Sequence, residues 1–126
     1  MASFDSLPET QRYLLWTLVQ IARADGDLSP LEATYVEHVA ELLALDEPSR
    51  ETIRAALLGR APLAEVAPPA SHADRVQVYR DAVVLAASDG DVERDEHEIL
   101  DGVAAALSLG ADEVDQIWRE AKAQPA

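Results

Sequence analysis

The chain has 126 residues, enough for one compact domain with a sizeable core, and 48% of them are hydrophobic. It has no cysteine, which excludes disulfides, thiolate catalysis and cysteine-based zinc sites. Its 24 acidic residues outnumber the 10 Lys and Arg, and the resulting net charge of −14 repels nucleic-acid phosphates and anionic membrane surfaces. We therefore expect no nucleic-acid partner.

The chain also lacks the patterns of membrane insertion and secretion. No run of apolar residues reaches the length of a membrane-spanning helix, so we expect no direct membrane insertion. The N-terminal sequence MASFDSLPET has neither the basic nor the apolar region of a signal peptide. We expect a cytoplasmic protein.

The first half of the chain predicts three helices. Apolar residues at helical spacing indicate a helix over 8–24 and a second helix that starts near Ser29 and ends at the sequence DEPSR. A third helix runs to about residue 58. The proline-rich segment 59–70 then forms a linker with at most one short helical turn.

The second half repeats this order. Helices are predicted over 71–88, 93–108 and 111–123. The segment Val19–Ile53 aligns without a gap with Val83–Ile117, so that every position of the first segment has one counterpart in the second. We therefore expect one all-α domain over 1–126, a compact helical bundle of six to seven helices built from two pseudo-repeated units, 8–58 and 71–123.

Each unit carries an acidic loop between its first two helices. In ADGDLSPLE, Gly26 suits the end of a helix, and Ser29, Pro30 and Glu32 form a capping box for the next one. Capping alone would explain this loop. The second copy, SDGDVERDE, has Glu93 and Arg94 in place of the cap, yet it keeps the acids and Gly90.

The spacing of these acids resembles part of a calcium loop. Glu32 and Glu96 each precede the apolar stripe of their helix, so both carboxylates are expected to face inward and to need a partner. The glycine, the apolar residue and the final Glu keep the register of an EF-hand, but the first ligand positions are apolar or basic, so each loop is half a site. Oxygen ligands suit hard cations, Ca²⁺ and less readily Mg²⁺, better than zinc or copper. The candidate metal ligands are Asp25, Asp27, Glu32, Asp89, Asp91 and Glu96.

Two such loops, at matching positions of the two units and each opening an amphipathic helix, resemble the tellurite-resistance TerB family, to which the N-terminal domain of DnaJ-like membrane co-chaperones is similar. The resemblance covers roughly residues 8–120. It implies a bacterial all-α stress-response module with a cation-binding surface. It also implies a protein partner, such as a membrane-associated stress protein, and resistance to tellurite or envelope stress.

Other functions remain as alternatives. The three histidines lack the Glu-x-x-His pairs of di-iron bundles, and there is no glycine-rich phosphate loop, so we expect no enzyme. His97, which lies among acids, is expected at the surface, and Phe4, Trp16 and Trp118 in the core. The main alternative is an acidic helical adaptor that binds a basic partner without a metal.

Overall fold

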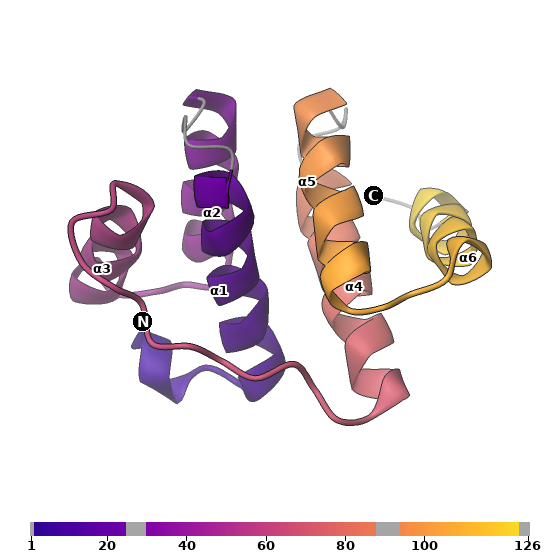
Figure 1. Cartoon of the computed structure of the whole chain (residues 1–126), viewed down its shortest axis with the longest axis horizontal. Coiled ribbons are helices and arrows are strands. Elements are labelled where there is room, and N and C mark those ends of the chain that lie inside the picture. The colour runs from indigo at the N-terminus through magenta and orange to yellow at the C-terminus, as the bar shows by residue number, and fades with distance from the viewer. Residues whose placement is uncertain (1, 25–29, 88–93, 124–126) are drawn as a thin grey trace.

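The computed structural model describes residues 2–24, 30–87 and 94–123, and these are mainly helical (Figure 1). An N-terminal 3₁₀ turn, η1, precedes six α-helices in this part of the chain. The all-α prediction is confirmed. The elements are η1 (Phe4–Ser6), α1 (Glu9–Ala24), α2 (Pro30–Leu42), α3 (Glu47–Leu57), α4 (His72–Ala87), α5 (Arg94–Ala106) and α6 (Ala111–Ala123).

The observed helix bounds lie close to the predicted ones wherever the sequence defined an end. The linker 59–70 contains no helical turn, because Pro62, Pro68 and Pro69 lack the amide hydrogen and disfavour helical geometry in the residue before them. The short turn lies instead at the N-terminus, where the Phe4 amide donates to Ser49 Oγ at 2.9 Å. No local pattern in the sequence predicts this turn.

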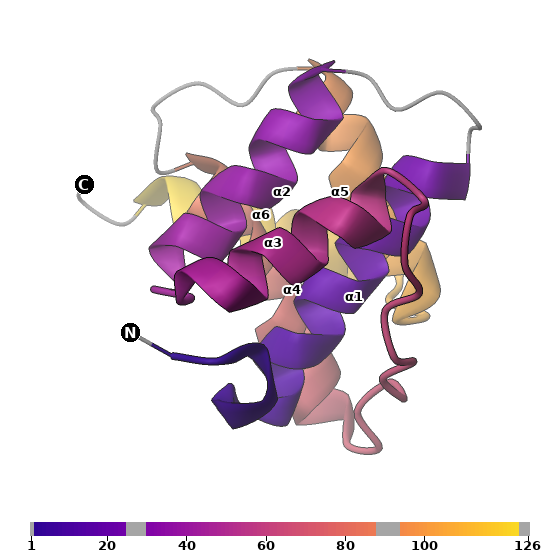
Figure 2. The same cartoon turned by 90° about the vertical axis from the view of Figure 1, so that its left-hand side faces the viewer.

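The helices form two groups of three, α1–α3 and α4–α6 (Figure 1). Helix α1 packs against both α4 and α5, and α2 packs against α5, so these four helices join the two groups. Helix α3 crosses over α1 and α2 on one outer side (Figure 2), and α6 packs on α4. No helix in the described part of the chain is both long and apolar enough to cross a membrane.

The backbone of the two groups repeats in the register of the sequence alignment. Ala44 and Ser108, which follow α2 and α5, both have positive φ, 58° and 57°. The amides of Leu45 and Leu109 donate to the carbonyl oxygens of residues 40 and 104, at 3.2 and 3.1 Å. In addition, the amide of Ala44 donates to the carbonyl of Glu41, and the amide of Ser108 donates to the carbonyl of Ala105. The two bonds at each helix end form a Schellman motif.

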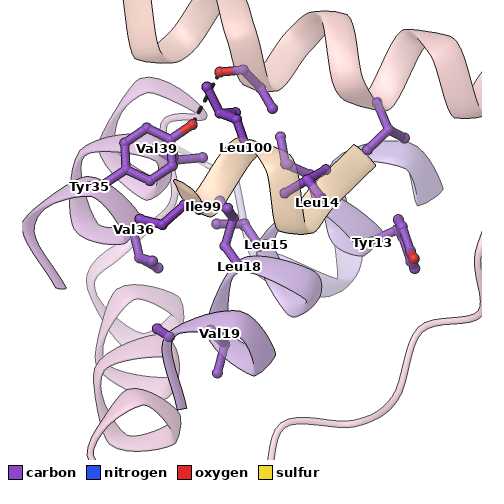
Figure 3. Close-up of a cluster of buried hydrophobic side chains, with 14 of the residues drawn as sticks. Tyr13, Leu14, Leu15, Leu18, Val19, Tyr35, Val36, Val39, Ile99 and Leu100 are labelled. Atoms are coloured by element: carbon purple, nitrogen blue, oxygen red, sulfur yellow. Dashed lines mark hydrogen bonds between the residues drawn. The ribbon is translucent and has the colours of Figure 1, made fainter. Parts of the chain in front are cut away.

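The core lies between α1, α2, α4 and α5 (Figure 3). Gly102 lets α1 approach α5, since a Cβ there would lie 3.1 Å from Ile21 Cδ1. The Tyr35 hydroxyl donates to the Ala82 carbonyl at 3.1 Å and joins α2 to α4. Equivalent positions of α1 and α4 are buried alike: Leu14 and Val78, Leu15 and Tyr79, Leu18 and Ala82, Val19 and Val83, Ala22 and Ala86.

Candidate functional site

The candidate cation site consists of the two acidic loops and the helices that flank them. Four of the predicted ligands, Asp25, Asp27, Asp89 and Asp91, lie outside the described residues, as do Gly26 and Gly90. Their role as ligands and turn residues stays a prediction. The structure does define where each flanking helix ends and begins.

Glu32 and Glu96 are the third residues of α2 and α5. Helix α2 begins at Pro30, the first helical position predicted for this proline. One turn further on, Tyr35 and Val36 are buried in α2, and the matching Ile99 and Leu100 are buried in α5. The two glutamates therefore occupy equivalent backbone positions at the head of equivalent buried stripes.

The structure brings the starts of these two helices to one end of the molecule. Helices α2 and α5 pack against each other. Both begin at the upper end of the molecule in the two perpendicular views (Figures 1 and 2). The backbone positions of Glu32 and Glu96 are thus presented on the same end of the bundle.

A contact network joins the start of α5 to α6 and α4. The exposed ring of His97 stacks on Trp118, with ring centroids 4.8 Å apart. Trp118 Nε1 in turn donates to the Tyr79 hydroxyl at 2.9 Å. Burial raises the pKa of Tyr79 above its ordinary value. The surface position predicted for His97 and the core packing predicted for Trp118 are both confirmed.

Sequence reasoning missed this network, although the repeat contains a signal for it. Trp118 occupies the position that Arg54 holds in the first group. Arg54 instead pairs with Glu37 of α2 at 2.9 Å and with Glu51 of its own helix. At this position the first group therefore has an exposed ion pair between α3 and α2, whereas the second group has a tryptophan that contacts α5 and α4.

Elsewhere in the described chain, charged pairs support the packing without forming a metal centre. His72 contacts Glu113, and Arg80 Nη2 lies 2.8 Å from Glu120, so two exposed pairs join α4 to α6. Among the residues that the structure describes, no group of three or more His, Asp or Glu side chains could hold a metal ion.

Comparison with known proteins gives a family. No curated protein and no solved structure matches the chain. One family model, "Protein of unknown function (DUF533)", matches residues 2–121, which include all six helices except the end of α6. The chain therefore belongs to the DUF533 family.

Proposed function

We propose that this protein is a TerB-like stress-response module that binds a divalent cation through its paired acidic loops and docks a protein partner. The observation that carries the proposal is the placement of Glu32 and Glu96. They hold equivalent positions in α2 and α5, two helices that begin at the same end of the bundle. Membership of DUF533 is compatible with a TerB-like module. The cytoplasmic location and the link to tellurite or envelope stress belong to the same proposal.

The chemistry of the donor set fits a hard cation. The two loops share two aspartates and one glutamate each, and Ca²⁺ takes six to eight oxygen ligands. Carboxylate oxygens are the ligands that Ca²⁺ takes in proteins, and Glu32 and Glu96 each supply one carboxylate. The ion would supply positive charge that draws the acidic loops together. His97 directly follows the second loop segment SDGDVERDE in the sequence, so the emission of Trp118, on which its ring stacks, would report such a change.

The test is thermal unfolding of the metal-stripped protein with and without millimolar Ca²⁺ and Mg²⁺. A ligand at about 100 times its Kd adds roughly 2.7 kcal/mol to the free energy of unfolding. We expect a Ca²⁺-dependent rise that disappears in the double variant Glu32→Gln/Glu96→Gln. In a Trp16→Phe background, the emission of Trp118 should change over the same range of Ca²⁺ concentration.

The matched control is Glu41→Gln/Asp101→Asn, which also removes one negative charge from each of α2 and α5, but at exposed positions further along these helices. This variant should keep the Ca²⁺ response. If Ca²⁺ produces no shift, or if both double variants lose it equally, the loops are structural turns. The protein would then be the acidic adaptor without a metal.

A further inference from the structure

A shallow apolar groove lies where the two groups of helices meet. It is lined by Gln11 and Leu14 of α1, by Leu43 at the end of α2, and by Asp81, Val84 and Leu85 of α4. Leu14 is fully buried and forms the floor, whereas Val84 is 45% exposed. Leu42, next to Leu43, is also 45% exposed. Within the lining of the groove, the side chain of Val84 is therefore in contact with water.

The repeat shows that the fold does not require this groove. At the equivalent positions of the other unit, Gln20 stands in place of Val84 and Arg75 in place of Gln11. Arg75 Nη1 donates to the Leu107 carbonyl, and its Nε donates to the Pro69 carbonyl. The equivalent side thus has a glutamine in place of the exposed valine, and its arginine is bonded to two backbone carbonyls.

The charge around the groove selects the kind of occupant. Asp81 is the charged residue of its lining. Leu43 directly follows α2, and Val84 lies in the last turn of α4. Neither last turn contains a basic residue, so the negative ends of both helix dipoles favour a cation supplied by a partner. The net charge of −14 disfavours a second copy of the chain and an anionic membrane surface.

We propose that this groove docks an amphipathic segment of a partner protein whose apolar residues cover Val84 and Leu43 and whose lysines or arginines face Asp81 and the ends of α2 and α4. The proposal deepens the docking part of the proposed function, on which it rests, by assigning its surface and the chemistry of the partner. The groove residues are distinct from the loop acids. Docking is therefore measured with divalent cations removed, and its failure is distinguishable from failure of the calcium test.

The test uses a fluorescently labelled helical peptide of leucine and lysine, with binding to the full chain followed by anisotropy. Val84→Gln, which installs the residue found at the equivalent position of the repeat, should weaken binding about tenfold, the factor that corresponds to roughly 1.4 kcal/mol. Asp81→Asn should also weaken binding, and more strongly at low salt than at high salt. A peptide of leucine and glutamate should not bind.

Two matched variants separate groove binding from general attraction to an acidic surface. Leu58→Gln changes an apolar residue that is 53% exposed elsewhere, and Asp74→Asn changes another exposed acid of α4. Both should bind the peptide as the unaltered chain does. Equal affinity in all variants, or equal losses in the groove and control variants, would overturn the assignment. So would a concentration-dependent dimer that Val84→Gln abolishes, since the groove would then be a self-interface.

Discussion

Replacing Ala44 and Ser108 by glycine should stabilise the protein. Both residues hold the left-handed conformation that ends α2 and α5, with φ of 58° and 57°. This conformation costs a residue with a Cβ about 1–2 kcal/mol, whereas glycine costs about 0.4–1 kcal/mol through the greater freedom of its unfolded chain. Each substitution should therefore add about 0.5–1 kcal/mol to the free energy of unfolding. Helix α3 already ends in the same motif with Gly59, at φ 72°.

The measurement is urea unfolding of Ala44→Gly, Ser108→Gly and the double variant. Because the two sites belong to different groups of helices, their effects on the free energy of unfolding should add. The double variant should therefore be about 1–2 kcal/mol more stable, with an unchanged m-value. The matched control is Ala105→Gly, at an exposed position inside α5, which should cost about 1 kcal/mol. If Ala44→Gly lowers the free energy of unfolding as Ala105→Gly does, residue 44 does not have the left-handed conformation. The matching helix ends of the two groups would then not be equivalent.

Two further predictions concern ionisable residues at structural positions. Tyr79→Phe leaves the Trp118 indole without its acceptor and should cost about 1 kcal/mol in chemical unfolding. Because the pKa of Tyr79 is raised by burial, its contribution is complete below its ordinary pKa of about 10 and is lost as pH rises, so the variant should show a weaker alkaline loss of stability. Asp46 caps α3 by accepting the Ser49 amide, which lowers its pKa, so its contribution is present above about pH 4 and is lost as pH falls. Asp46→Asn should therefore flatten the acid side of the stability profile, and an unchanged profile would contradict the capping geometry.

Much of the fold could be predicted because local signals agree with the packing. The helices begin and end at residues with known preferences, such as Pro30 at the first position of α2 and Gly59 after α3. The gapless alignment of Val19–Ile53 with Val83–Ile117 also agrees with the structure, in which the equivalent Val19 and Val83 are both buried, as are Ala22 and Ala86. The turn Phe4–Ser6 escaped prediction because a distant contact with Ser49 stabilises it.

The surroundings of the candidate site were harder to predict, because they depend on contacts between helices far apart in the sequence. Nothing in the segment around His97 indicates that its ring stacks on Trp118 of the following helix. The groove at Val84 likewise requires knowing that α1, α2 and α4 meet there. In both places the two repeats differ in sequence, with Trp118 in place of Arg54 and Val84 in place of Gln20. The alignment shows these differences but not which residues the side chains contact.

The way the described helices are capped bears on the meaning of the acidic loops. Helices α3 and α4 both begin after a short side chain that accepts an amide hydrogen bond three residues later, Asp46 from Ser49 and Ser71 from Asp74. The first acidic loop offers Ser29 for this role, but the second offers Glu93, whose longer side chain is a poor cap. Since the loops share Asp-Gly-Asp and the later glutamate while differing at the cap, helix capping explains the part that varies and leaves the shared acids unexplained. A common cation is the simplest physical reason for two repeats to keep the same three carboxylates, and the comparison of Glu32→Gln/Glu96→Gln with Glu41→Gln/Asp101→Asn tests that reason directly.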